Sequence, residues 1–331
     1  MNNESFLVFG AGSWGTALSI QLYKAGNKVF LTSFDETNLS KIKTEKENKK
    51  YLPGVEVPEG ISIGPISEEA IARSTSILIC VKSPGFIETV SLLGPTMTNK
   101  KIVWATKGFD PDNGSFLSGA IEGMLGGAIQ TAVISGPTFA EELAMGKPAA
   151  LTLATKNILN PDRLAEAMSG DSLRVYTSED MIGVQFGGGF KNIIAIAAGI
   201  SDGLDLGANA KAALVTRGLE EMKHLGVALG AEKKTFFGLS GLGDLVLSST
   251  DNQSRNRALG GLIGSGQSFS SSIERLGSTP EGANAIKTLV KNKIVTADQP
   301  ISFSVYQVLY ENLSPSEAAK VLMERPVGDE H

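Results

Sequence analysis

The stretch "FLVFGAGSWGTA" (residues 6–17) joins a short apolar run to the start of an amphipathic pattern through three glycines. The apolar run, residues 6–10, predicts a buried β-strand. Gly10 permits a tight turn, Gly12 lets the backbone approach a pyrophosphate, and Gly15 lets the following helix pack close to the strand. The first N–H groups of that helix would bind an anion. This strand–loop–helix context predicts a dinucleotide-binding loop.

The next strand, predicted over residues 28–34, should select between two forms of the dinucleotide. NAD-binding proteins place an acid about 20 positions on, where it accepts the ribose hydroxyls, whereas NADP-binding proteins place a basic residue there. Asp35 stands near that position, slightly beyond the apolar run, and no arginine is close. Lys41 and Lys43 lie further on and are expected to be solvated. The sequence therefore leaves NAD and NADP both open.

Apolar runs and helical patterns alternate through the first half of the chain. Alternation of this kind predicts a parallel sheet with helices on both faces. The strands are expected at 6–10, 28–34, 76–81, 101–108, 131–137 and 149–155, and the first helix at 13–25.

Beyond about residue 180 the periodicity becomes helical. Helices are expected at 181–200, 208–229, 255–264, 281–291 and 314–323. Thr279 and Ser314 stand at N-cap positions, the latter with the spacing of a capping box to Glu317. We expect a Rossmann-type domain over residues 1–178 and an all-α substrate and catalytic domain over residues 179–331.

Composition limits the class of protein. With 331 residues, 42% hydrophobic and 20% charged residues, the chain should fold as two globular domains. A net charge of −5 argues against a general nucleic-acid binder. The one cysteine, Cys80, allows no disulfide framework and favours a reducing cytoplasm. We expect no signal peptide and no membrane-spanning segment, because no apolar run approaches about 18 residues.

A dehydrogenase needs a group that moves the proton of the alcohol while hydride moves. Only two histidines occur: His224 lies inside a helical pattern and His331 is the last residue. No tyrosine is followed by lysine four residues later, so the pair used by short-chain dehydrogenases is absent. The sequence therefore points to a lysine or a carboxylate.

Lys191 is the strongest candidate. It lies in "QFGGGFKNIIAIAAG" (185–199), which is otherwise apolar or glycine apart from Gln185 and Asn192. Burial disfavours the ammonium and would bring its pKa toward neutrality. A lysine that extends from an apolar helix to solvent fits the pattern as well. Asn192 could anchor a hydroxyl.

Three further stretches suggest ligand contacts. Lys107 follows a predicted strand at the end where open α/β sheets bind ligands. Asp244 lies in a glycine-rich segment whose simpler interpretation is turn chemistry. Arg255, between Ser254 and Asn256, would suit a phosphate, although a solvated helix start fits equally.

Six motifs occur in the order found in bacterial NAD(P)-dependent sn-glycerol-3-phosphate dehydrogenases, and the similarity covers about residues 5–325. They are "GAGSWGTA", "ATKG", "SGPTFAEELAMGKPAA", "FKNIIAIAAG", "GLSGLGDLVLSST" and "SRNR". The resemblance implies reversible reduction of dihydroxyacetone phosphate to sn-glycerol 3-phosphate for phospholipid synthesis. It also implies a Rossmann domain followed by a helical domain, NAD or NADP as cofactor, no metal ion, a homodimer and a cytoplasmic setting.

The resemblance also implies a role for particular residues. Lys191 would move the proton, Lys107 would orient substrate and cofactor, and Asp244 would hold Lys191. The substrate would meet Lys107, Gly136, Thr138, Lys191, Asp244, Ser254, Arg255 and Asn256. The cofactor would meet Gly10, Gly12, Ser13, Trp14, Gly15, Phe34, Tyr51, Lys107, Ala140, Arg255, Thr279 and Glu281.

The chain departs from the family pattern at several positions. Thr32 and Phe34 stand where the family often has tryptophan and a basic residue, so no strong preference for NADPH is expected. Lys82 replaces the usual proline after its strand, and Thr138 replaces a serine while keeping the hydroxyl. The run 187–189 has more glycine than usual, which could loosen the helix that carries Lys191, and the sequence leaves this effect open.

Two other functions remain open from the sequence. A related 3-hydroxyacid dehydrogenase would have a similar domain arrangement but act on carboxylates. A dinucleotide-binding sensor without turnover would use the lysines only as phosphate ligands.

Overall fold

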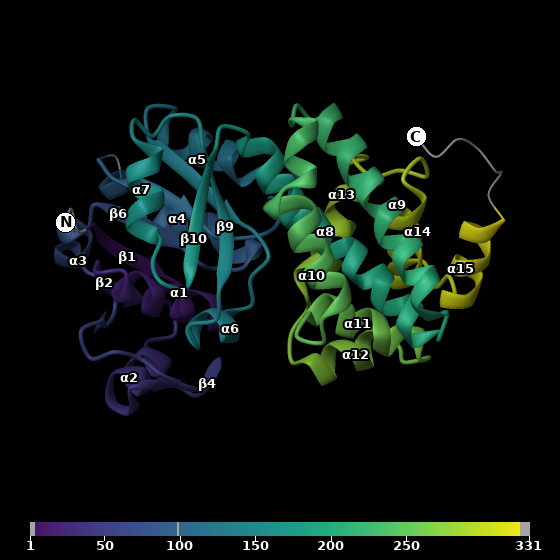
Figure 1. The fold of residues 1–331 in the computed structure, drawn as a ribbon, viewed down its shortest axis with the longest axis horizontal. Helices are drawn as coiled ribbons and strands as arrows, with labels where there is room; N and C mark the ends of the chain where they lie inside the picture. The colour runs from purple at the N-terminus through teal and green to yellow at the C-terminus, as the bar shows by residue number, and fades with distance from the viewer. Residues whose placement is uncertain (1–3, 98, 325–331) are drawn as a thin grey trace.

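The structure is a computed structural model that describes residues 4–97 and 99–324 (Figure 1). Figure 1 shows the strands gathered on one side of the molecule and the helices α8 to α15 on the other. In the described residues, one sheet has eight strands in the order β10-β9-β8-β7-β6-β1-β2-β5. They are β1 (Ser5–Phe9), β2 (Lys28–Thr32), β5 (Ser62–Ile63), β6 (Ser76–Ile79), β7 (Lys101–Trp104), β8 (Gln130–Ser135), β9 (Ala149–Thr155) and β10 (Leu173–Ser178).

The strand order has a switch point at β1. The chain passes from β1 to β2 on one side and later returns to place β6 on the other side. Ligands of open α/β sheets bind outside the carboxyl ends of the strands at such a point. The predicted mainly parallel sheet is confirmed, with one exception, since β8 and β9 pair antiparallel. β10 had no clear sequence signal, and it pairs parallel with β9.

Both faces of the sheet are covered by helices. Those between strands are α1 (Ser13–Lys24), α2 (Glu36–Glu45), α3 (Glu68–Arg73), α4 (Ser83–Leu93), α5 (Leu117–Leu125), α6 (Ala140–Ala144) and α7 (Pro161–Met168). A separate hairpin consists of β3 (Glu47–Asn48) and β4 (Leu52–Glu56).

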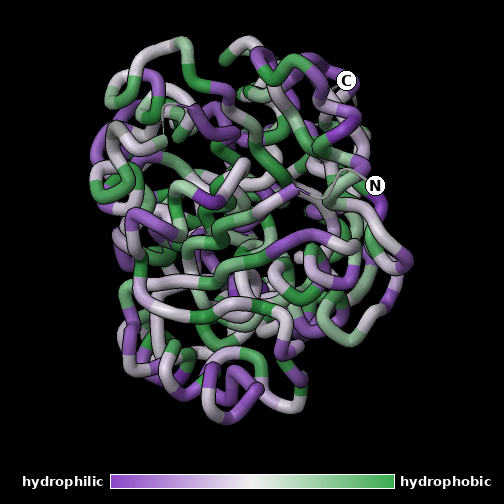
Figure 2. Tube along the Cα trace, turned by 90° about the vertical axis from the view of Figure 1, so that its left-hand side faces the viewer, coloured by the Kyte–Doolittle hydropathy of each residue, from purple (hydrophilic) through white to green (hydrophobic). Residues whose placement is uncertain are grey.

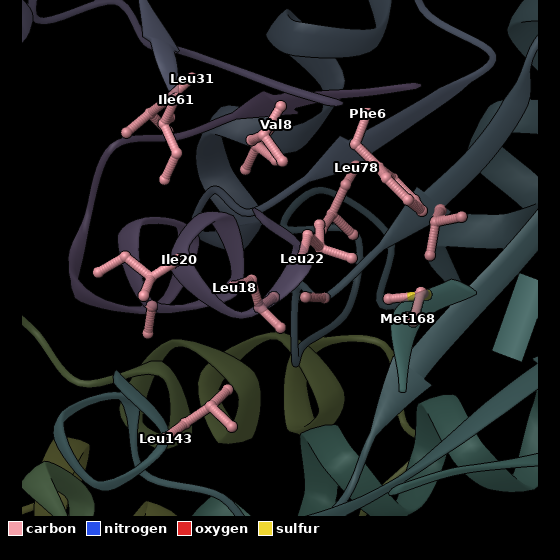
Figure 3. Close-up of a cluster of buried hydrophobic side chains, with 14 of the residues drawn as sticks. Phe6, Val8, Leu18, Ile20, Leu22, Leu31, Ile61, Leu78, Leu143 and Met168 are labelled. Carbon is pink, nitrogen blue, oxygen red and sulfur yellow. The ribbon is translucent and has the colours of Figure 1, made fainter. Parts of the chain in front are cut away.

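Alternate residues of β1 enter different cores. Phe6 and Val8 belong to the core that includes Leu18 and Leu22 of α1, and Figure 3 shows these side chains gathered between strand and helix. Leu7 and its neighbours pack in the core on the opposite face. Because side chains of a strand alternate between faces, a strand covered on both sides must be apolar throughout. This explains the uninterrupted run at residues 6–9.

The C-terminal part of the chain is helical. It contains α8 (Met181–Gly203), α9 (Gly207–Ala228), α10 (Asp244–Thr250), α11 (Arg255–Gly264), α12 (Phe269–Leu276), α13 (Glu281–Lys291), α14 (Pro300–Tyr310) and α15 (Pro315–Met323). A 3₁₀ turn (Lys233–Phe237) and a π-helical turn (Leu239–Gly243) precede α10. The five predicted helices are confirmed to within a few residues, whereas α10, α12 and α14 were not predicted.

The predicted helix starts differ in accuracy. Ser314 forms the expected capping box with Glu317. The expectation that Thr279 caps α13 is wrong, since the helix begins at Glu281 with Pro280 at the cap position and no side-chain cap. The fixed backbone angle of proline allows it to stand at the cap as well as inside the first turn.

The helix α8 is the centre of the helical core. Among the described residues, α8 is the one helix that is long and apolar enough to cross a membrane, judged by length and composition. The uninterrupted apolar runs of the sequence did not suggest this property. Of its apolar window 94% is buried inside the protein, as in a core helix. In Figure 2, hydrophobic stretches run through the middle of the view and hydrophilic ones occupy much of the outline.

Glycines bring α8 and α11 into backbone contact. A Cβ on Gly199 would lie 2.0 Å from the carbonyl oxygen of Arg257, and a Cβ on Gly260 would lie 2.0 Å from that of Ile196. Gly203 and Gly264 are equally restricted. This close approach fixes the start of α11, including Arg255, against the helix that carries Lys191.

We predict that Gly199→Ala lowers the free energy of unfolding by about 1–3 kcal/mol, because the added methyl group must separate two packed helices. Denaturant-induced unfolding followed by circular dichroism measures the change. Gly123→Ala is a matched control: Gly123 lies in α5, and a Cβ there would meet no atom within 4 Å. That substitution should stabilise the protein by about 0.5–1 kcal/mol. Equal effects of the two substitutions would contradict the role of Gly199 in helix packing.

Candidate functional site

The loop between β1 and α1 has the geometry of a phosphate cradle. Gly10 has a φ of +121°, and a Cβ there would lie 2.5 Å from the carbonyl oxygen of Cys80. A Cβ on Gly15 would lie 1.8 Å from the carbonyl oxygen of Gly10. Gly12 faces open space and caps α1 without a side-chain hydrogen bond. The first-turn N–H groups of Ser13 and Trp14 are therefore available to an anion.

The residues just after β2 form several polar and aromatic contacts. Asp35 accepts a hydrogen bond from the N–H of Asn38 (3.0 Å) and pairs with Lys50 (2.7 Å). The bond to Lys50 is the main reason why the pKa of the Asp35 carboxyl lies below its usual value. Phe34 is 50% exposed and packs edge-on against Phe9, while the Lys50 ammonium lies over the Tyr51 ring. Both oxygens of the Asp35 carboxylate thus already accept hydrogen bonds, one of them from the Lys50 ammonium.

One carboxylate joins the two candidate lysines. Asp244 Oδ1 accepts from Lys191 Nζ (2.8 Å) and Asp244 Oδ2 from Lys107 Nζ (2.6 Å). Asp244 is 1% exposed and Lys191 is 7% exposed. Lys191 also donates to the hydroxyl of Ser248, and Lys107 donates to the carbonyl oxygen of Gly136 (3.0 Å). Lys191 is therefore buried in a polar cluster and does not extend to solvent.

This burial changes the acid–base behaviour of Lys191. Loss of solvent lowers its pKa to about 8, and the nearby Lys107 cation contributes in the same direction. Asp244 opposes both effects and keeps the ammonium from being lost at neutral pH. A group with this pKa can donate or accept a proton near physiological pH, as general acid–base catalysis requires.

The three glycines before Lys191 allow close packing of α8. A Cβ on Gly187 would lie 2.6 Å from the carbonyl oxygen of Ser240, one on Gly188 would lie 2.5 Å from Ser135 Oγ, and one on Gly189 would lie 2.9 Å from the Phe109 ring. Gly187 thus meets the segment before Asp244, Gly188 meets the residue before Gly136, and Gly189 meets the segment after Lys107. The missing side chains therefore let α8 meet all three segments closely.

Asn256 links the helices around the site. Its Nδ2 donates to Asn192 Oδ1 (2.9 Å), and its Oδ1 accepts from the N–H of Gly282 at the start of α13 (2.9 Å). Ser254 caps α11 by accepting from the N–H of Arg257. Asn256 therefore connects the residue after Lys191 in α8 with the start of α13, while the Ser254 hydroxyl stabilises the start of α11.

Arg255 and Glu281 lie where the helical region meets the end of β6. Arg255 Nη2 donates to the carbonyl oxygens of Leu276 (3.0 Å) and Ser278 (2.7 Å). Glu281 Oε2 accepts from the Ser83 hydroxyl (2.9 Å), and burial raises the pKa of the Glu281 carboxyl. Glu281 thus connects the first turn of α13 with the first residue of α4.

The remaining predicted positions follow β8 or lie between α12 and α13. Gly136 has a φ of +153°, and a Cβ there would lie 2.8 Å from the carbonyl oxygen of Ala150, so the position requires glycine. The Thr138 hydroxyl donates to the carbonyl oxygen of Gly136 (3.3 Å). Ala140 begins α6, and Thr279 lies in the loop that Arg255 contacts.

Sequence reasoning did not select Ser248, Ser83 or Ser278. Ser248 stands four residues after Asp244, which places both side chains on one face of α10, so this spacing could have revealed it. Ser83 and Ser278 become significant only through contacts between distant segments. His224 is 72% exposed at its side chain, and His331 lies outside the described residues.

Cys80 carries the one thiol of the chain. Burial raises the pKa of the Cys80 thiol, so it is a poor nucleophile. Residues 4–97 and 99–324 contain no cluster of three or more His, Cys, Asp or Glu side chains that could hold a metal ion.

Two family models match this chain. Residues 5–160 match the model described as the NAD-dependent glycerol-3-phosphate dehydrogenase N-terminus, and residues 180–320 match the corresponding C-terminus. The two matches correspond to the sheet region and the helical region.

Curated relatives and a solved structure agree with these models. The chain is 44% identical over 331 residues to glycerol-3-phosphate dehydrogenase [NAD(P)+] of Escherichia fergusonii, covering 99% of this chain and 98% of that protein. It is 42% identical to the enzyme of the same name from Pseudoalteromonas translucida, covering 96% of both. The crystal structure of glycerol-3-phosphate dehydrogenase from Coxiella burnetii superposes with a TM-score of 0.92 at 39% identity, covering 98% of this chain and 99% of that one.

We predict that Asp244→Asn lowers the free energy of unfolding by about 3–5 kcal/mol, because two buried or partly buried ammonium groups lose their shared counter-charge. Urea denaturation at pH 7 measures the change. Asp171→Asn is the control, since Asp171 is exposed and its loss should change stability by less than about 0.5 kcal/mol. A stability of Asp244→Asn equal to that of the control would show that the carboxylate does not hold the lysines.

Proposed function

The chain belongs to the NAD-dependent glycerol-3-phosphate dehydrogenase family, and from this membership we propose how its site carries out the reaction. It is an NAD(P)-dependent oxidoreductase that interconverts dihydroxyacetone phosphate and sn-glycerol 3-phosphate. The observation that supports the proposed mechanism most directly is the buried Asp244 carboxylate between Lys191 and Lys107.

The described residues fit a dinucleotide. Gly10 and Gly15 leave no room for side chains where the backbone turns, Gly12 faces open space, and the first turn of α1 begins at this loop. The indole N–H of Trp14 is buried without a partner among the described residues, so another donor remains beside the loop. When bound, the nicotinamide supplies or accepts the hydride.

Lys191 moves the proton. In the direction of reduction, the carbonyl carbon gains the hydride, the carbonyl oxygen gains a proton from the Lys191 ammonium, and a neutral amine remains. In the direction of oxidation, that amine takes the hydroxyl proton as the hydride leaves. The pKa of about 8 permits both states near neutral pH.

Lys107 and Asp244 orient the reacting groups. Asp244 holds both ammonium groups, so Lys107 stays near the oxygen on which negative charge develops and stabilises it. Arg255, with Ser254 and Asn256, supplies donors for the phosphate of the substrate. Gly136 and Thr138 line the same side, next to Lys107.

Three further points are part of the proposal. Residues 1–178 form the dinucleotide-binding domain and residues 179–331 the substrate domain, which is supported by the end of β10 at Ser178 and the start of α8 at Met181. The protein works as a homodimer in the cytoplasm, with its product used in phospholipid synthesis. Sedimentation at micromolar concentration tests the oligomeric state.

The direct test of the function follows nicotinamide absorbance with purified protein and dihydroxyacetone phosphate, comparing NADH with NADPH. Turnover with this substrate, and none with 3-hydroxy acids in the reverse assay, is the expected result. Activity only with hydroxy acids would contradict the proposed substrate.

We predict that Lys191→Met lowers kcat by about 10³-fold or more while NADH binding stays within about threefold, because the proton carrier is lost but the phosphate cradle remains. Stopped-flow absorbance and NADH fluorescence titration measure the two quantities. Lys223→Met is a control at a lysine of low exposure in α9, outside the proposed site. Unchanged turnover in Lys191→Met would exclude the proposed mechanism, whereas absent turnover in the unmodified protein would favour the sensor alternative.

We predict opposite pH dependences for the two directions. Reduction needs the Lys191 ammonium, so its kcat/KM should fall as pH rises through about 8, while kcat/KM for oxidation should rise through the same range. Because Asp244 raises the pKa of Lys191, Asp244→Asn should move both transitions to lower pH. Transitions that stay in place in this variant would show that another group titrates.

We predict that Lys50 supports NADPH. A 2′-phosphate could replace Asp35 as the partner of Lys50, so Lys50→Met should lower kcat/KM for NADPH by about threefold to tenfold and leave that for NADH nearly unchanged. Asp35→Asn, which frees Lys50, should shift the ratio toward NADPH. Steady-state kinetics with both cofactors measure the ratio, and equal losses for NADH and NADPH in Lys50→Met would contradict this role.

A further inference from the structure

Two cations outside the proposed catalytic cluster share one neutral acceptor. The hydroxyl of Ser278 accepts from Lys82 Nζ (3.0 Å) and from Arg255 Nη2 (2.8 Å). Arg255 also donates to backbone carbonyls, and within residues 4–97 and 99–324 neither cation forms an ion pair. Glu281 is an acid whose charge interacts with both Lys82 and Arg255, although its oxygens accept hydrogen bonds from Ser83.

This arrangement leaves two exposed cations close together without a hydrogen bond to an acid among the described residues. Partial loss of solvent and repulsion from Arg255 lower the pKa of Lys82. A serine hydroxyl can satisfy donors but cannot compensate two positive charges. A pair of converging cations with only neutral acceptors is the arrangement that binds a phosphate through charge-assisted hydrogen bonds.

The location of Lys82 indicates whether the two cations would bind the phosphates of the dinucleotide or the phosphate of the substrate. Lys82 caps α4 directly after β6, the strand that flanks β1 at the switch point. The carbonyl oxygen of Cys80, two residues earlier, is the atom that requires glycine at position 10. Lys82 therefore lies in the segment that follows β6 and runs beside the phosphate loop. Lys191, which we propose moves the proton, lies within α8 and pairs with Asp244.

We propose that Lys82 is a second cationic ligand, acting with Arg255, for the pyrophosphate of the bound dinucleotide. In the structure the Ser278 hydroxyl is their shared acceptor, and phosphate oxygens replace it when the cofactor binds. The inference rests on the proposed function, because it assigns a residue to the cofactor of that reaction. The family usually has proline at this position, so this cation adds to the common set of cofactor contacts.

A purely mechanical role makes a different prediction. If Lys82 only connects the segment after β6 with the loop before α13, then substituting Lys82 or Ser278 should change NADH binding by the same amount. If Lys82 binds phosphate, removal of its charge should weaken binding, while removal of the Ser278 hydroxyl should leave both cations available.

The experiment measures NADH dissociation constants by fluorescence titration over a range of ionic strength. We compare the unmodified protein with Lys82→Gln, Lys82→Arg, Ser278→Ala and Lys24→Gln. Lys24 is an exposed lysine at the opposite end of α1 from the phosphate loop, so Lys24→Gln makes the same change in net charge away from the site. KM for dihydroxyacetone phosphate at saturating NADH is measured in parallel.

Lys82→Gln should raise the NADH dissociation constant about tenfold at low ionic strength and reduce its salt dependence, because a screened charge contact has been removed. Lys82→Arg should restore most of the affinity, and Ser278→Ala and Lys24→Gln should stay within about twofold.

Equal losses in Lys82→Gln and Ser278→Ala, or an unchanged NADH dissociation constant in Lys82→Gln, would overturn the assignment. A change confined to KM for dihydroxyacetone phosphate would also overturn it, by assigning Lys82 to the substrate phosphate. Failure of the proposed function would instead show as NADH binding without turnover in the unmodified protein.

Discussion

The buried Asp244 carboxylate is the interaction on which the site depends. Two ammonium groups a few ångströms apart repel each other strongly when solvent is excluded, and one shared carboxylate compensates both. Lys107 comes from the sheet region, whereas Lys191 and Asp244 come from the helical region. The same contact therefore sets the acid–base behaviour of Lys191 and the way in which the two regions meet. A second connection, between Glu281 and Ser83, lies at the end of β6.

Glycine makes these contacts geometrically possible. At residues 187–189 the missing side chains let α8 touch the segments that carry Lys107 and Asp244, and further along the helix Gly199 meets α11. Packing of backbone against backbone leaves few alternative arrangements, because interiors are close-packed and cannot deform gradually. The flexibility that glycine gives to an isolated helix is thus absent once its neighbours are in place. Local propensity and tertiary packing lead here to opposite expectations.

Sequence reasoning succeeded where a function requires a local pattern. The glycine loop and the apolar strands around it were predicted to within a few residues, and so were the helices α8, α9, α11, α13 and α15, since each is defined by spacing along the chain. The short strand β5, the edge strand β10 and the helices α10, α12 and α14 were missed because tertiary contacts, rather than a strong apolar period, stabilise them. The bounds of α13 were predicted correctly, but its cap was assigned to Thr279 instead of Pro280, because proline can stand at the cap or just inside the helix.

The sequence by itself determined the dinucleotide loop, the alternation of strands and helices, and the presence of a lysine in an apolar helix. It left open whether Lys191 reaches solvent, because the direction of a side chain depends on what surrounds the helix. Only the tertiary structure brought Lys191 and Lys107 to Asp244, and Lys82 and Arg255 to Ser278. The physical reason is that burial and charge compensation are properties of neighbours in space, and these neighbours are distant along the chain.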